Sequence, residues 1–269
     1  MALAQVYRPA VTIDSGMSNE ADQSRMSIAD LEARCRGEMI PLSGKFSYFS
    51  TVPLAEEDLR HYLQDPIAAL PTAVIATLPR MNIILAPYLE KGGVASGPRS
   101  GDAVTFERPA DNRQIGTTLW EKDDSVLLVF GIKEIEIADY HYQFYNTLAA
   151  LVADRWSEEV QERFHRTLRE ELTSEVHGEV DEKSWHLKQA LLRRQTNVRK
   201  ETKLFREYAR QSFEDTLTLY LHGTCCDIDV ETGPRQMPSR YLRRRLELLL
   251  SLYPPPEGYA VLPEQLKVR

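Results

Sequence analysis

The sequence predicts an α+β protein, in which a mainly antiparallel sheet in the N-terminal half packs against a C-terminal set of three or four helices. Two observations predict this fold class. Between residues 72 and 132, short β-branched and apolar runs alternate with Gly, Pro, Asp and Asn. After residue 138, apolar residues recur at helical spacing almost to the end of the chain.

The first 45 residues predict a mobile polar arm with one short helix. The stretch 15–25 carries no apolar period, whereas Ser27 is a good N-cap for a helix over 28–36. The remaining residues, 46–269, predict a single α+β domain with its sheet over 72–132 and its helical part over 139–253. A helix over 54–64 precedes the sheet and is expected to stop before Pro66, because proline interrupts helical hydrogen bonding.

Five runs in the first half are typical of β-strands. They cover 73–78, 82–89, 103–107, 116–121 and 125–132. The last two are separated by Lys122, Asp123 and Asp124, a polar spacer of hairpin length. Because successive runs lie too close together to hold crossover helices, we expect antiparallel pairing.

The second half predicts three helical stretches. An apolar residue at every fourth position from Phe144 to Leu172 predicts one amphipathic helix over about 139–173. A second stretch begins near residue 184, is interrupted near 196, and ends with Gly223 as its C-cap. The third covers 239–252 and ends before three consecutive prolines.

Composition excludes several classes of protein. With 8 Phe, 12 Tyr and 3 Trp among 269 residues, the chain has enough large apolar side chains for a folded core. Three cysteines cannot form a disulfide framework, and their odd number favours a reducing compartment, so we expect the cytoplasm. We expect no signal peptide and no membrane segment, since the longest apolar runs are far too short to cross a bilayer.

The net charge of −7 hides two blocks of opposite sign. Residues 121–182 hold 6 basic and 16 acidic side chains, a net of −10, whereas 183–245 hold 14 basic and 7 acidic ones, a net of +7. Either the two blocks pair with each other across a solvated seam, or the basic helices face a partner.

The second alternative gives the leading functional hypothesis, a non-catalytic intracellular interaction or accessory protein whose basic helical surface binds an anionic partner. A protein partner or larger assembly is favoured, and nucleic acid stays an alternative. The expected partner-binding residues are Arg193, Arg194, Arg199, Lys200, Lys203, Arg206, Arg210, Arg240, Arg243 and Arg244, with Arg245 in the same group. Because no familiar catalytic motif occurs, neither an HExxH helix nor a GxSxG elbow nor a phosphate-binding loop, catalysis stays undecided.

The alternative hypothesis is a metal-dependent hydrolase with a divalent metal as cofactor. The segment 222–231 gathers one His, two Cys and three acids, and such side chains are metal ligands. The candidate centre consists of His222, Cys225, Cys226, Asp227 and Asp229, with His141 as a more distant member. In the competing interpretation the apolar side of this segment packs inward and its acids face water. Convergence of His141, His186 and His222 would favour the metal centre.

Overall fold

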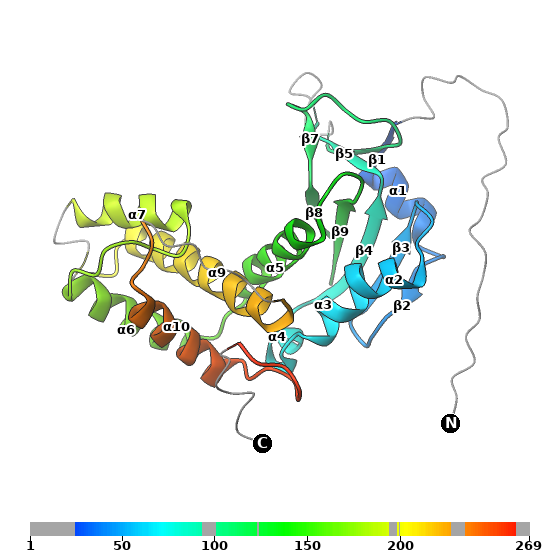
Figure 1. The fold of residues 1–269 in the computed structure, drawn as a ribbon. Coiled ribbons are helices and arrows are strands. Elements are labelled where there is room, and N and C mark those ends of the chain that lie inside the picture. Colours follow the sequence, from blue (N-terminus) through cyan, green and yellow to red (C-terminus); the bar gives the residue numbers. More distant parts are fainter. Residues whose placement is uncertain are drawn as a thin grey trace, which may run out of the picture. The chain divides into compact units, whose positions relative to one another are not determined.

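The computed structural model describes residues 25–92, 101–122, 124–193, 198, 200–226 and 235–261, and confirms the α+β class (Figure 1). Contacts divide the chain into two compact units. The first unit comprises the described residues up to Asp58 together with Arg80–Ile135, and the second comprises Leu59–Pro79 and the described residues from Glu136 onward. The predicted limits at residues 45 and 46 stay a prediction.

The first unit contains two sheets and a short helix. Its elements are β1 (Arg25–Ser27), α1 (Ile28–Cys35), β2 (Ile40–Pro41), β3 (Phe46–Ser50), β4 (Arg80–Ala86), β5 (Tyr88–Glu90), β6 (Ala103–Thr105), β7 (Gln114–Ile115), β8 (Thr117–Lys122) and β9 (Ser125–Gly131). One sheet has the order β1-β6-β5-β7 and is antiparallel. The other has the order β2-β3-β4-β9-β8.

The larger sheet is mixed. Strands β2 and β3, and likewise β8 and β9, pair antiparallel, the latter as the predicted hairpin with Lys122 opposite Ser125. At its centre, β4 runs parallel to both β3 and β9. The close spacing of the strand runs predicted antiparallel pairing, on the assumption that a parallel pair needs a crossover helix. The connection from β4 to β9 is long enough for a parallel crossover because it contains β5 to β8 instead of a helix.

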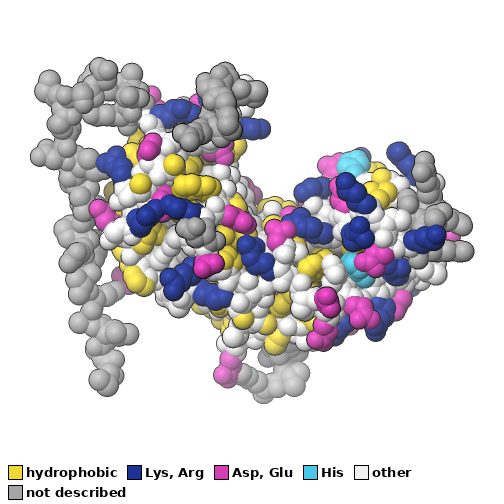
Figure 2. Space-filling view, turned by 180° about the vertical axis from the view of Figure 1, so that it is seen from behind, with side chains coloured by type: hydrophobic (Ala, Val, Ile, Leu, Met, Phe, Trp, Pro, Cys, Tyr) yellow, Lys and Arg dark blue, Asp and Glu magenta, His cyan; other side chains and the backbone are white. Residues whose placement is uncertain are grey.

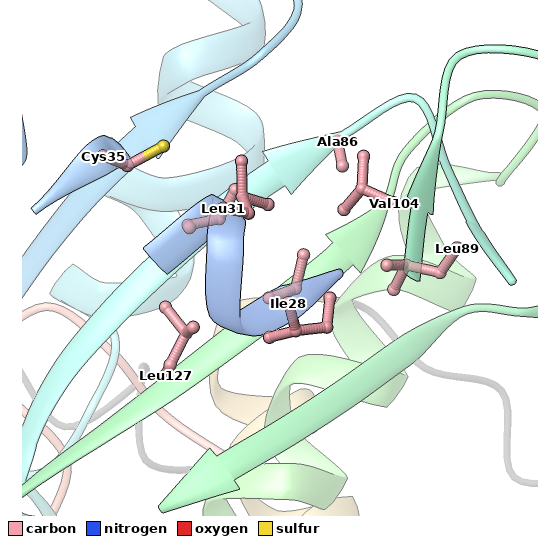
Figure 3. Packing of buried hydrophobic residues seen from close by; sticks show 9 residues of the cluster. Ile28, Leu31, Cys35, Ala86, Leu89, Val104 and Leu127 are labelled. Atoms are coloured by element: carbon pink, nitrogen blue, oxygen red, sulfur yellow. The ribbon is translucent and has the colours of Figure 1, made fainter. Parts of the chain in front are cut away.

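Helix α1 covers one face of this sheet, as predicted for residues 28–36. The Ser27 hydroxyl accepts a hydrogen bond from the backbone N–H of Asp30 and caps the helix. Alternate residues of β4 and β9 face the helix because side chains alternate along a strand. The buried cluster (Figure 3) consists of Ile28, Leu31, Cys35, Ile84, Ala86, Leu89, Val104, Leu127 and Val129.

The second unit is helical. After α2 (Glu56–Leu59), along which the chain leaves the first unit, it contains the π-helical turn η1 (Arg60–Gln64), α3 (Asp65–Ala68), α4 (Thr72–Thr77), α5 (Ile137–Ala153), α6 (Glu158–Thr173), α7 (Glu182–Leu192), α9 (Lys203–Cys225) and α10 (Ser239–Leu252). The predicted final helix is confirmed with its limits. Helix α9 contacts α5, α6, α7 and α10 and forms the centre of this unit (Figure 1).

The strand predicted over 73–78 is wrong, because these residues form helix α4. Val74 and Ile75 favour strands, but the buried side chains are those of Val74 and Leu78, four residues apart. This spacing places both on one face of a helix, so burial overrides the weak preference of the β-branched residues.

Two predicted elements are each divided in the structure. The run 82–89 contributes to β4 and to β5, which belong to different sheets and are separated by Pro87. The predicted helix over 139–173 is two helices, α5 and α6. Ser157 begins the second, since its hydroxyl accepts the N–H of Val160. Trp156, in the turn between the two helices, packs against Phe213 of α9, which explains why the apolar period continued.

No helix in the described part of the chain is long and apolar enough to cross a membrane.

Candidate metal centre

Helix α9 extends past Gly223, where the sequence predicted its end, and continues to Cys225. The backbone N–H of Cys226 donates to the carbonyl of His222 at 2.9 Å, and the Thr224 hydroxyl donates to the carbonyl of Tyr220. This extra turn changes the geometry of the site. His222 and Cys226 are four residues apart, so they lie on the same face at the end of the helix.

A second feature of the site is the backbone around Pro66. The sequence predicted a helix end before this proline, but the chain stays helical through a π-helical turn. The N–H of Asp65 donates to the carbonyl of Arg60 instead of that of His61. Because Pro66 has no N–H, the helix leaves the carbonyl of His61 open to a partner elsewhere.

His141, in the first part of α5, binds this carbonyl. Its Nε2 lies 2.8 Å from the carbonyl oxygen of His61, and its Nδ1 lies 3.1 Å from Sγ of Cys226. A carbonyl can only accept, so Nε2 carries the proton and donates. In the neutral ring, Nδ1 therefore presents its lone pair toward Cys226. Burial lowers the pKa of His141, which favours this neutral form.

His222 faces the same place. Its ring lies 6.4 Å from that of His141 and 5.9 Å from that of Tyr145, measured between centroids. Its Nε2 is buried and has no hydrogen-bond partner among the residues that the structure describes. Burial and the neighbouring His141 lower the pKa of His222, so this imidazole is also favoured in its neutral form. A buried ring nitrogen without a partner is uncommon in a folded protein.

Together, His141, His222 and Cys226 form a group that could hold a metal ion. One ligand atom from each residue lies within 4.8 Å of the others. Ligand atoms around one tetrahedral zinc ion are roughly 3.3–3.8 Å apart, since its bonds to N and S are about 2.0–2.3 Å long. A small movement of side chains would therefore complete the geometry. Two imidazoles and one thiolate suit zinc, and they do not suit Mg²⁺ or Ca²⁺, which prefer oxygen ligands.

Cys225 and Tyr145 lie beside this group. The Tyr145 hydroxyl is buried and donates to the carbonyl of Pro66 at 3.2 Å. The thiol of Cys225 contacts both Tyr145 and Cys226. Hydrogen bonding with Cys226 and Tyr145 lowers its pKa to about 7, against the opposing effects of burial and Asp65.

The structure brings together some of the predicted metal ligands and leaves others apart. His141, His222 and Cys226 converge, with Cys225 adjacent. Asp227 and Asp229 lie outside the described residues. His186 belongs to α7, is exposed, and has its Nε2 3.5 Å from Glu182, so it takes no part in the group.

Many members of the predicted basic surface pair with acids. Arg210 lies 2.6 Å from Asp154 and 3.5 Å from Glu214, and Arg244 pairs with Glu170. Other contacts are local: Arg243 with Glu247, and Arg240 stacked on the ring of Tyr241. Figure 2 shows charges of both signs mixed over the visible face. Arg210 and Arg244 are thus paired with acids of the acidic block that precedes them, whereas Arg243 pairs with an acid of its own helix.

A smaller set of cations stays exposed between the end of α7 and the first turns of α9. It consists of Arg193, Lys200, Lys203 and Arg206. Arg206 also donates to the backbone carbonyl of Glu201. Arg194 and Arg199, which belong to the same predicted surface, lie outside the described residues.

Arg245 cannot face a partner, contrary to the sequence-based prediction, because its side chain is fully buried. Its guanidinium is 2.5 Å from Glu171 and 2.8 Å from Glu179. The remaining members are Lys188, Tyr208 and Ser212, all of which bind Glu179. We call this set the ion network. Burial opposes the charge of Glu179, yet Arg245 and Lys188 lower its pKa to about 2.

Sequence reasoning missed two parts of the site. The His-x3-Cys spacing of 222–226 is a metal-ligand pattern when helical, but the prediction of a helix end at Gly223 hid it. The hydrogen bond between His141 and the carbonyl of His61 joins residues 80 positions apart, and no signal in the sequence indicates it.

No protein-family model, curated protein or solved structure matches this chain.

Proposed function

We propose that the protein binds one zinc ion through His141, His222 and Cys226. The observation that carries this proposal is the convergence of three ligand atoms within 4.8 Å of one another, from two helices that are far apart in the sequence. Two of these residues offer neutral nitrogen and one offers sulfur, which is a donor set that zinc prefers.

The surroundings of the ligands support the proposal. A histidine that binds zinc usually donates its other ring N–H to a carbonyl or carboxylate, which fixes the ring and its tautomer. His141 has this arrangement through the carbonyl of His61. His222 contributes a buried nitrogen that no described residue binds, which a metal ion would satisfy.

Metal analysis of the purified protein tests the proposal. After dialysis against chelator and reloading with zinc, we expect one equivalent of zinc per chain for the native protein. His222→Ala and Cys226→Ser should each lower zinc affinity by at least tenfold in a competition titration with a chromogenic chelator. His186→Ala serves as the matched control, since that histidine is exposed and lies outside the group.

Two outcomes would overturn the proposal. One is a chain that folds and takes up less than a tenth of an equivalent of zinc. The other is uptake of a full equivalent that His222→Ala and Cys226→Ser leave unchanged, because the ion would then be bound elsewhere. Circular dichroism of each variant keeps loss of metal distinct from loss of fold.

We also propose that the exposed cations Arg193, Lys200, Lys203 and Arg206 bind an anionic protein partner. This proposal is supported by their position in one stretch of chain, from the end of α7 to the first turns of α9, where all four side chains are exposed. The paired residues Arg210, Arg243 and Arg244 contribute less, because acids already neutralise them.

Charge reversal tests this second proposal. A variant with Arg193, Lys203 and Arg206 all changed to Glu should lose the salt-sensitive binding that the native chain shows to an acidic-peptide array. Changing Arg243 and Arg244 to Glu is the control and should have a smaller effect. Equal binding by native and triple-variant proteins, both folded, would exclude this surface.

A further inference from the structure

Two cysteines stand side by side at the end of α9. Cys225 and Cys226 are neighbours in the chain, and both carry a thiol. Cys226 belongs to the group of proposed zinc ligands, whereas Cys225 lies outside that group. Because the two residues share a peptide bond, the proposed sulfur ligand always has a second thiol beside it.

These two thiols differ from that of the third cysteine in their exposure. Cys225 and Cys226 are both partly exposed, which gives a small oxidant access to this end of the helix. Cys35 is only 3% exposed and belongs to the hydrophobic cluster of the first unit. Oxidation of a cysteine depends on its exposure, so we expect it at residues 225 and 226 and not at Cys35.

The backbone here allows the two sulfurs to be joined. Cys225 is the last residue of α9, and Cys226 already has an extended backbone, with φ −131° and ψ 147°. Rotation at this point affects the last helical hydrogen bond, from the N–H of Cys226 to the carbonyl of His222, and not the interior of the helix.

The short distance between neighbouring residues also determines how stable such a bond is. Consecutive Cα atoms are about 3.8 Å apart, whereas those of ordinary disulfides are about 4.4–6.8 Å apart. A disulfide between neighbours is therefore strained, and strained disulfides are reduced easily. A bond between Cys225 and Cys226 would thus form and break with the supply of oxidant and reductant.

We infer that Cys225 and Cys226 are the site of a reversible disulfide, and that its formation takes Cys226 away from the zinc ion. The oxidant is a peroxide. Release of zinc rests on the zinc proposal above, whereas formation of the disulfide does not. Zinc binds the thiolate of a cysteine, and a disulfide has no thiolate, so His141 and His222 would be left to hold the ion without Cys226.

The reaction is a two-electron oxidation. Hydrogen peroxide oxidises one of the two thiols to a sulfenic acid, and its O–O bond breaks to release one water. The neighbouring thiol then attacks this sulfur, so that an S–S bond forms and the S–O bond breaks to release a second water. The two thiols lose two hydrogens to the peroxide. When zinc is bound, one sulfur is already a thiolate, and solvent supplies the proton that it lacks.

Mass spectrometry of the metal-free chain tests the disulfide. One equivalent of hydrogen peroxide should lower the mass by about 2 Da, in the peptide that holds both Cys225 and Cys226, and dithiothreitol should restore it. Cys35 is the control within the chain and should stay unmodified. The inference is wrong if either sulfur gains oxygen instead, if two chains become linked, or if dithiothreitol leaves the bond intact.

Release of zinc is followed with a chromogenic chelator. Peroxide should release close to one equivalent from the zinc-loaded native chain, and reduction should restore its uptake. In Cys225→Ser, oxidised Cys226 has no neighbouring thiol and proceeds to irreversible acids, so at most about a tenth of the uptake should return after reduction. Cys35→Ser should behave like the native chain.

The outcomes separate the two proposals. Zinc that stays bound after the disulfide has formed would overturn the inference, and so would full recovery of uptake by Cys225→Ser. A native chain that takes up no zinc before oxidation would instead overturn the zinc proposal, and the mass measurement on the metal-free chain would still decide whether the disulfide forms. Circular dichroism before and after oxidation shows whether the fold is retained.

Discussion

The ion network and the proposed zinc ligands both place polar side chains among the helices of the second unit, but they differ in how many of their polar atoms have partners. In the ion network, Arg245 pairs with Glu171 and Glu179, Lys188 pairs with Glu179, and the hydroxyls of Tyr208 and Ser212 also bind the oxygens of Glu179. At the proposed zinc ligands, one ligand atom each from His141, His222 and Cys226 lies within 4.8 Å of the others, and the buried Nε2 of His222 has no hydrogen-bond partner among the described residues.

This difference separates a structural role from a functional one. The buried charges of the ion network are paired with one another and leave no atom for a ligand. Their role is to hold α6, α7, α9 and α10 together. Burying the polar ligand atoms of His141, His222 and Cys226 costs free energy, and a bound cation would offset that cost. Strongly shifted pKa values occur in both regions, so they do not by themselves distinguish the two.

The largest effect should follow from breaking the ion network. Arg245→Met leaves Glu171 and Glu179 buried with one cation, Lys188, which should cost about 3–5 kcal/mol of unfolding free energy. Urea denaturation followed by circular dichroism measures this loss. A change below 1 kcal/mol would mean that the network does not hold these helices together.

Zinc should give the next largest effect, and it should act through the other region. At a free concentration one hundred times its dissociation constant, zinc should stabilise the native chain by about 2.7 kcal/mol, provided that it binds only the folded state. Thermal unfolding with zinc and with chelator measures this difference. Cys226→Ser should remove most of it, whereas Arg245→Met should retain it as long as that variant folds.

Asp215 offers a smaller effect with a defined dependence on pH. Burial raises the pKa of its carboxyl from 3.8 to about 6, so the folded state binds more protons than the unfolded state between these values. Stability from this group is fully present below pH 3.8 and is lost as the pH rises through about 6. Between pH 5 and 7.5 the native protein should lose about 1 kcal/mol more than Asp215→Asn. Parallel urea titrations would detect this, and identical pH profiles would argue against it.

The smallest effect should come from Arg244, the neighbour of Arg245 on α10. Its pair with Glu170 is exposed, with half of each side chain accessible, so Arg244→Ala should change the unfolding free energy by only about 0–1 kcal/mol. Comparing the losses of unfolding free energy in Arg244→Ala and Arg245→Met, measured in the same denaturation series, shows how much burial adds to the contribution of an ion pair. If both variants lost the same unfolding free energy, the buried ion pair would contribute no more than the exposed one.

Much of the fold could be predicted from the sequence because local signals were strong. Ser27 predicted the start of α1, the polar spacer after β8 predicted a hairpin, and Pro254 predicted the end of α10. Errors arose where long-range burial decided the local structure. The short stretch around Val74 is helical because of what it packs against, and parallel pairing of β4 depends on strands far away in the chain.

The candidate site was only partly predictable for the same reason. The sequence indicated His222 and Cys226 through their closeness, and it proposed His141 without a geometric reason. That reason is the open carbonyl of His61, created by a π-helical turn and Pro66. This carbonyl is open because Pro66 has no backbone N–H to donate to it. From the sequence, Pro66 predicted the end of a helix and gave no sign that a carbonyl would be left for His141.

The π-helical turn before Pro66 also makes backbone chemistry part of the specificity of the site. Replacing this proline by alanine would supply an N–H that competes with His141 for the carbonyl of His61. The imidazole would then be free to rotate or to move its proton to the other nitrogen, and the donor atom that faces Cys226 would no longer be fixed. Pro66 would not itself bind the metal. Because it lacks a backbone N–H, it would nevertheless determine which ring nitrogen of His141 is available to a metal ion.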